Sequence, residues 1–379
     1  MVAAEAGSYD TQEKVPAPES SAPGERPSRV LVAADPPGDW AVLHAGLRPH
    51  LGTFGGIATL ALAHARTERF YGIFSLSAIR NDAGTHVGIA QLGLGRNLSD
   101  NFIGVSQISL TENRARTFWG LGQTALAYNR SLSMVGVLQL AGYNRAKTFT
   151  GALQLGGYNR ADVAFSGIAQ IGAFNHARGD FTGALQLGAL NGSGELFNED
   201  GEEDLRFAGL GQIGVVNSAE RFRGLMQLGV ASFAGGDFAG GLQIGALAAG
   251  AQEFRGVAQI GLVAVSEESY GLQIGAGAIA LEEHTGFQLG ALANYAESIS
   301  GVQVGLVNVA QKVDGVQIGL VNHAGQLRGV QIGLINHAED GVLAWTALVN
   351  MGFGDGGASL DEDQYAEPFA RRSGTLERF

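Results

Sequence analysis

The sequence predicts an all-β protein, a parallel β-solenoid of about nineteen short coils. First, a Gly-x-x-Gln-Ile/Leu-Gly-x-x-Asn unit recurs every 14–16 residues. Second, 59 of the 379 residues are glycine, which favours tight corners and close backbone stacking. Third, no proline occurs between Pro49 and Pro368, and such a stretch suits unbroken strand ladders because proline lacks a backbone donor.

A column of glutamines defines the repeat. Glycine precedes each glutamine by three residues up to Gln259, and by two residues from Gln273 onward. Continuing the same spacing places Ser75 and Thr59 upstream, and Trp345 downstream, at the position of the glutamine, which gives about nineteen units. Helical and leucine-rich repeats need longer periods, so the spacing predicts coils of two or three short strands. The glutamines are Gln91, Gln107, Gln123, Gln139, Gln154, Gln170, Gln186, Gln212, Gln227, Gln243, Gln259, Gln273, Gln288, Gln303, Gln317 and Gln331.

The alternative architecture is an up-and-down β-barrel with one strand per unit, which would make the chain an outer-membrane barrel or pore component. Antiparallel strands would alternate short and long turns, but the spacings of the glutamines show no such alternation. Membrane barrels also carry aromatic girdles, whereas aromatic residues make up only 8% of this chain. The solenoid is therefore the preferred prediction.

The chain divides into segments of different composition. Residues 1–29, rich in proline, alanine and glutamate, predict a disordered tail without a visible signal peptide. Residues 55–350 form the tandem-repeat domain, interrupted by an acidic insertion at 192–206. Because the end coils of a parallel stack expose unpaired edges, we expect 30–54 to form an N-terminal cap or entry segment, and 351–379 a C-terminal cap and tail.

Within each coil, alternation predicts that the aliphatic residue after glutamine points inward, as at Leu155, and that Gln154 points outward in a register-holding amide ladder. The asparagine five or six residues later is expected at a corner. Phenylalanine five residues before glutamine predicts a buried aromatic ladder, which ends where the coils shorten. Its members are Phe102, Phe118, Phe149, Phe165, Phe181, Phe207, Phe222, Phe238 and Phe254.

The units at 315–324 and 329–338, GVQIGLVNHA and GVQIGLINHA, resemble the tandem surface-repeat proteins of spirochaetes, myxobacteria and Bacteroidetes. The resemblance covers roughly residues 55–350, and that bacterial family is largely uncharacterised. It implies an exported protein at the cell surface or outer membrane. The N-terminus lends no support to export, so a cytoplasmic location stays open.

Composition narrows the possible functions. The formal charge of −12 argues against nucleic-acid binding, and the absence of cysteine excludes disulfides and thiolate sites. No catalytic motif is recognisable, and the equivalent histidines His176, His323 and His337 lack the carboxylates that a metal site needs. We therefore expect a non-enzymatic structural or adhesive rod, a rigid scaffold or partner-binding protein, without cofactor or metal.

Two charged features are candidate interaction sites. Acidic residues in the insertion, such as Glu199 and Asp200, could bind calcium, although a solvated loop is the simpler interpretation. Arginines near the asparagine of six consecutive units predict a basic stripe that could bind an acidic protein, an anionic glycan or lipid headgroups, although a solvated charged face is the simpler interpretation. Contact with a membrane and end-to-end or lateral self-association also stay open. The stripe consists of Arg80, Arg96, Arg114, Arg130, Arg145 and Arg160.

Overall fold

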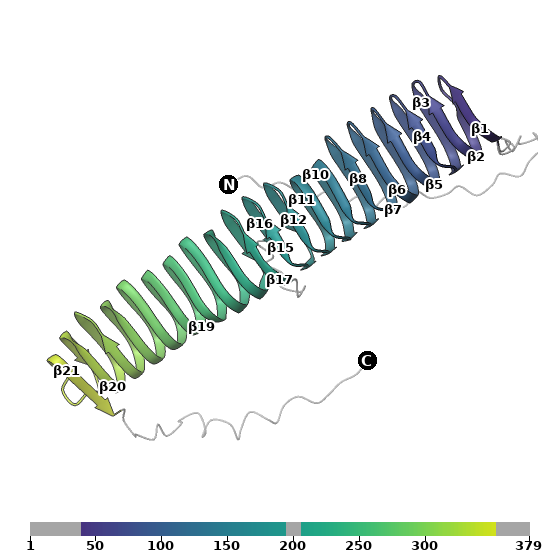
Figure 1. Ribbon diagram of the computed structural model, residues 1–379. Helices are drawn as coiled ribbons and strands as arrows, with labels where there is room; N and C mark the ends of the chain where they lie inside the picture. Colours follow the sequence, from purple (N-terminus) through teal and green to yellow (C-terminus); the bar gives the residue numbers. More distant parts are fainter. Residues whose placement is uncertain (1–38, 195–205, 354–379) are drawn as a thin grey trace, which may run out of the picture. The chain divides into compact units, whose positions relative to one another are not determined.

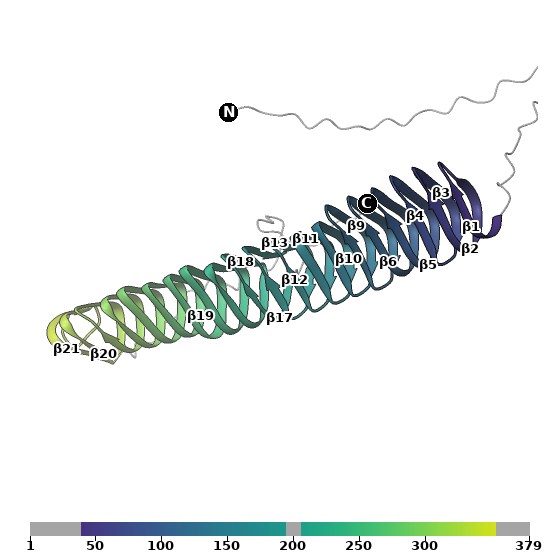
Figure 2. The same cartoon turned by 45° about the horizontal axis from the view of Figure 1, so that its top comes forward.

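A computed structural model describes residues 39–194 and 206–353, all of which belong to the compact unit Pro37–Phe379. This unit is all-β, with about 18 turns stacked along one axis (Figure 1, Figure 2). Successive coils pair in parallel and in register. The predicted solenoid is confirmed, and the barrel is wrong. In the parts of the chain that the structure describes, no helix has the length and apolarity to cross a bilayer.

The described strands belong to one 21-stranded sheet. They are β1 (Asp39–Gly46), β2 (His50–Ala61), β3 (His64–Tyr71), β4 (Phe74–Ser77), β5 (Arg80–Gly93), β6 (Arg96–Ser109), β7 (Glu112–Trp119), β8 (Gly122–Ala125), β9 (Tyr128–Val135), β10 (Leu138–Thr150), β11 (Leu153–Ser166), β12 (Ala169–Ile171), β13 (Phe174–Ala177), β14 (Asp180–Thr182), β15 (Leu185–Leu187), β16 (Leu190–Ser193), β17 (Arg206–Ile213), β18 (Val216–Ala219), β19 (Arg221–Ile318), β20 (Val321–Ala338) and β21 (Trp345–Phe353). β19 is one continuous ladder that winds through several coils (Figure 1).

Each coil has three sides, which are resolved most clearly as β12, β13 and β14. These strands carry the inward side chains Gln170, Asn175 and Phe181, respectively. Each strand pairs in parallel with the equivalent strand one coil later, so that identical residues stack. We call the three sides the Gln strand, the Asn strand and the Phe strand.

The two ends of the stack are built differently. β1 pairs in parallel with β2, so residues from 39 onward already form a coil. β21 pairs antiparallel to β20, so the unit expected to continue the solenoid at Trp345 turns back instead. Asn350 on β21 then donates from Nδ2 to Oε1 of Gln331, the last glutamine of the column, at 3.3 Å. Residues 30–38 and 354–379 lie outside the described residues.

The aromatic ladder is confirmed. Every predicted phenylalanine is buried, and neighbouring Phe rings stack with centroids 4.7–5.3 Å apart. The structure extends the column upstream to Phe54 and Phe70. It also adds two members of another type, His86, which stacks between Phe70 and Phe102, and Met134.

The predicted orientation of the Gln strand is wrong. All sixteen glutamines of the column are fully buried, whereas Leu155, expected inside, is 37% exposed. From Gln107 to Gln331, each Nε2 donates to Oε1 of the glutamine one coil earlier at 2.7–3.0 Å. Because each amide finds a partner in the coil above and below, burial leaves it satisfied, and alternation then places the aliphatic neighbours outside.

The asparagines form a second interior ladder, not the expected corners. Between Asn97 and Asn217, and again between Asn294 and Asn336, each Nδ2 donates to Oδ1 of the next coil at 2.7–3.1 Å. This direction is opposite to that of the glutamine ladder, so the dipoles of the two amide rows oppose one another. In most coils a glycine two residues after the glutamine packs against this ladder, and a Cβ at Gly172 would lie 2.1 Å from the Gly156 carbonyl oxygen.

Candidate functional site

The predicted arginine stripe lies on the outer surface of the Asn strand, because the residues on either side of an inward asparagine point outward. Register divides it into two adjacent columns. Arg80 and Arg96 each precede an asparagine and occupy equivalent positions in adjacent coils. The same column continues with Glu112 in the next coil. The other four arginines follow an asparagine and stack in the neighbouring column, Arg114, Arg130, Arg145 and Arg160.

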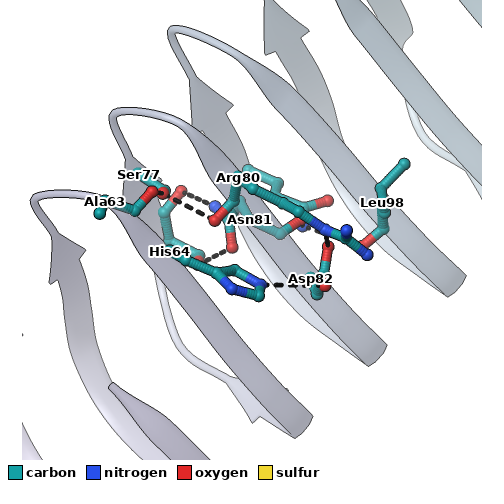
Figure 3. A network of polar contacts seen from close by, with 9 residues as sticks. Ala63, His64, Ser77, Arg80, Asn81, Asp82 and Leu98 are labelled. Atoms are coloured by element: carbon teal, nitrogen blue, oxygen red, sulfur yellow. Dashed lines mark hydrogen bonds and ion pairs between the residues drawn. The ribbon is translucent and has the colours of Figure 1, made fainter. Parts of the chain in front are cut away.

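The first column is partly neutralised by Asp82 (Figure 3). The Arg80 Nε donates to Oδ1 of Asp82 at 2.7 Å, and His64 Nε2 lies 3.0 Å from its Oδ2. The hydrogen bond to Asp82 raises the pKa of Arg80 above its already high value. This network ties two adjacent coils together and leaves Arg80 little charge to offer a partner.

The far end of the second column is neutralised in the same way. Arg145 and Arg160, one coil apart, donate to opposite oxygens of Asp162 at 2.8 and 2.6 Å. Burial opposes the charge of Asp162, but the hydrogen bonds from both guanidiniums outweigh this effect and lower its pKa. These two arginines therefore act mainly as a clamp between coils.

The central arginines remain available. Arg114 and Arg130 form no ion pair with any residue that the structure describes, and they line a groove of about 610 Å³. Arg66 and Arg116, which the sequence analysis did not select, line the same groove. Arg66 was missed because Ala65 stands at the asparagine position, as its pairing with Asn81 reveals. Alignment of the coils by their period, without requiring an asparagine in each, would have identified Arg66.

The groove can recognise anions. Guanidinium groups bind carboxylate, phosphate and sulfate oxygens in a planar, bidentate geometry. Three acids also line the groove, Glu68, Asp82 and Asp100, so its charge favours anions without being uniformly positive. A ligand with several spaced anionic groups would match the repeat of arginines from coil to coil.

The histidines at the other end form a pair. The Nδ1 atoms of His323 and His337 lie 2.8 Å apart, and the ring of Trp345 on β21 packs against His337 at 4.2 Å. His176 instead contacts the carbonyl oxygen of Gly194 at 3.3 Å. Among the described residues there is no group of three side chains that could hold a metal ion. The acidic residues Glu199 and Asp200 lie outside the described ranges.

No known family model matches the chain, and neither a curated protein nor a solved structure shows significant similarity to it.

Proposed function

We propose that this protein is a non-enzymatic scaffold, a stiff rod that holds bound partners at fixed spacing. The observation that carries the proposal is the uninterrupted glutamine ladder, in which sixteen buried amides are joined from coil to coil. A bend or a slip of one coil would break buried hydrogen bonds, each of which costs about 1–3 kcal/mol when left unpaired. Resistance to bending is the property that a spacer or scaffold needs.

Spin-label distances test the stiffness directly, and the chain contains no cysteine that would interfere. Thr150 and Ser300 are exposed and follow equivalent inward positions on the Phe strand, nine coils apart. At about 4.8 Å per coil, the double variant Thr150→Cys/Ser300→Cys should give a narrow distribution near 43 Å. A broad distribution, or one centred far below this value, would refute the rod as a scaffold.

A second function is favoured by the arginines of the groove, of which Arg114 and Arg130 form no ion pair with a described residue. We propose that Arg66, Arg114, Arg116 and Arg130 bind an anionic glycan. Calorimetric titration with a sulfated oligosaccharide should show binding that weakens with salt. The double variant Arg114→Gln/Arg130→Gln should lose most of it, while Arg223→Gln, an exposed arginine outside the groove, should bind normally. Equal binding by all three proteins would contradict the assignment.

The resemblance to bacterial surface repeats supports a further proposal, that the rod works at the cell surface or outer membrane, where it would adhere to a partner. Protease treatment of intact source cells tests this placement. Degradation of the protein while a cytoplasmic marker survives is the expected result. Protection of the protein until the cells are lysed would place it inside and would leave the scaffold proposal itself untouched.

A further inference from the structure

The outer surface of the Gln strand carries no charge. From two residues before to four residues after each of the sixteen glutamines, no unit contains Asp, Glu, Lys, Arg or His. The outward positions in this window are mostly aliphatic, as at Leu126, Leu210, Val257 and Leu334, which are 76%, 62%, 68% and 62% exposed. We call this surface the apolar face.

The apolar face is continuous because the coils are in register. Equivalent outward residues stack from coil to coil along the Gln strand and the corner that follows it. In the first coils, the leucine columns enclose a groove of about 360 Å³ whose wall is almost wholly apolar, lined by residues such as Leu62, Leu94 and Leu110. A groove of this kind accepts protruding aliphatic side chains.

The apolar face is large enough that a partner surface is expected to bury it. About 18 coils at about 4.8 Å give a length of roughly 85 Å, and a three- to four-residue strand is about 12 Å wide. The area is therefore on the order of 1,000 Å², well above the few hundred Å² of contiguous apolar surface that soluble monomers expose. Buried against an equal face, it would total about 2,000 Å², which is at the upper end of a standard stable interface.

The distribution of charge along the chain indicates which partner buries the apolar face. Residues 64–180 contain eleven Lys and Arg and six Asp and Glu, whereas residues 206–353 contain six and eleven. The two halves thus carry opposite net charges of +5 and −5, with histidine neutral. A second copy placed antiparallel brings each basic half beside an acidic half. An anionic membrane would attract only the basic half and repel the other.

We propose that two copies of this chain pack antiparallel, with their apolar faces against one another, as a side-by-side dimer. Two sheets with aliphatic inner faces pack about 10 Å apart in the manner of a β-sandwich. The arginine groove lies on the Asn strand, outside this interface, and so each dimer presents two grooves at opposite ends. The inference goes beyond the scaffold proposal, because a single stiff rod would serve as a spacer with or without a partner copy.

Mass and orientation are measured on the full chain. Light scattering of the purified protein without detergent should give twice the chain mass of 39.3 kDa. For orientation, single-cysteine variants carry one spin label per chain. Thr182, at the end of β14, lies about halfway along the stack of coils, and Ser300, in the last third of β19, lies near its C-terminal end. An antiparallel dimer predicts an offset along the axis of about 5 Å between Thr182 labels and about 60 Å between Ser300 labels.

Other arrangements give different results. Short distances at both positions would indicate parallel packing, and a long distance at Thr182 would indicate end-to-end association; either overturns the proposal. A monomer of 39.3 kDa overturns it as well. Such a monomer, if it floated with vesicles of phosphatidylcholine and phosphatidylglycerol, would assign the apolar face to a membrane.

A matched pair of variants tests the interface. Val257→Glu places a charge on the apolar face, and Gln252→Glu places the same charge on an exposed position of the same coil outside it. We expect Val257→Glu to weaken dimerisation at least tenfold, because a buried, unpaired carboxylate is costly, while Gln252→Glu dimerises normally. Both variants should keep the β circular dichroism spectrum. Dimers of equal strength in the two variants would exclude the apolar face as the interface.

Discussion

The coils before and after Phe254 share the glutamine column but differ in the column on the Phe strand. In the N-terminal section, the inward residue stands five positions before glutamine and is mostly Phe. In the C-terminal section it stands four positions before glutamine and is never Phe; the members are Ser269, His284, Ile299, Val313 and Leu327. The glycine of the corner also moves from three positions before glutamine to two.

This difference shows that the length of a coil and the volume of its interior change together. In the N-terminal section the corner glycine lies against the ring, so that a Cβ at Gly167 would meet Phe165 at 2.8 Å. In the C-terminal section the corner is one residue shorter, and its glycines adopt φ values between +124° and +146°. L-residues avoid this region, so the tighter corner depends on glycine. The glutamine ladder crosses the boundary unbroken.

The largest expected effect concerns the tight corners of the C-terminal section. Gly315 has φ +146°, and a Cβ there would lie 1.9 Å from the Gly301 carbonyl oxygen. Gly315→Ala should therefore lower the free energy of unfolding by about 2–6 kcal/mol, from backbone strain plus displacement of the coil. Gly277→Ala is the control, because no atom lies within 4 Å of its Cβ position. Denaturant unfolding that ranks the two variants equally would refute the corner argument.

The next effect compares the interiors of the two sections. Phe165→Ala removes a stacked ring and should cost about 3–5 kcal/mol through lost burial and a cavity. Val313→Ala removes only two methyl groups and should cost about half as much. Hydrogen exchange should show each loss concentrated near the mutated coil, because repeat arrays couple mainly through neighbours. If Val313→Ala were the more damaging change, the interior of the C-terminal section would be misassigned.

A smaller effect comes from the histidine inside the aromatic ladder. His86 lies between Phe70 and Phe102 without a hydrogen bond at either ring nitrogen, and burial lowers its pKa to about 3. In the unfolded chain its pKa is near 6.5. Above about pH 6.5 the histidine is neutral in both the folded and the unfolded chain, and its burial does not lower the free energy of unfolding. As the pH falls toward 3, only the unfolded chain takes up the proton, so the free energy of unfolding decreases.

Replacing this histidine should remove the pH dependence that it causes. Between pH 7 and 4.5, the stability of His86→Phe relative to the wild type should rise by about 2–3 kcal/mol. His284, its counterpart in the C-terminal section, has a pKa lowered by burial to about 4 and accounts for a similar loss over this range. Thermal melting at the two pH values measures the change. A constant difference between variant and wild type would mean that His86 is not held neutral.

The sequence predicted the stacking and the buried Phe column, but not which side of the Gln strand faces the interior. The 14–16-residue period, the high glycine content and the Phe column together indicate a parallel solenoid, and each of these features can be read directly from the sequence. The burial of glutamine could not be read from hydrophobic alternation, because an amide is satisfied inside only when identical coils stack in register. One signal was available: Gln is invariant in sixteen units, while the residue after it varies among Ile, Leu, Thr and Val. Only an enclosed position restricts the side chain so strictly.

The candidate site was predicted less well for the same reason. The six arginines were grouped by their distance from asparagine, yet Arg96 stacks on Glu112 and not on Arg114. Membership of the groove depends on register across units whose asparagine is replaced, as at Ala65, and on which acids reach each guanidinium. Those contacts are set by side-chain geometry, which spacing does not encode.

The central claim, that the glutamine column is an interior ladder, is tested most directly by hydrogen exchange of the glutamine side-chain amides in selectively ¹⁵N-labelled protein. Gln252, Gln311 and Gln326 lie outside the column and are exposed, so they serve as controls within the same molecule. The ladder predicts that amides of the column exchange orders of magnitude more slowly than these three, with protection extending across the boundary at Phe254. If the column amides exchanged as fast as the controls, the glutamines would face solvent and the interior described here would be wrong.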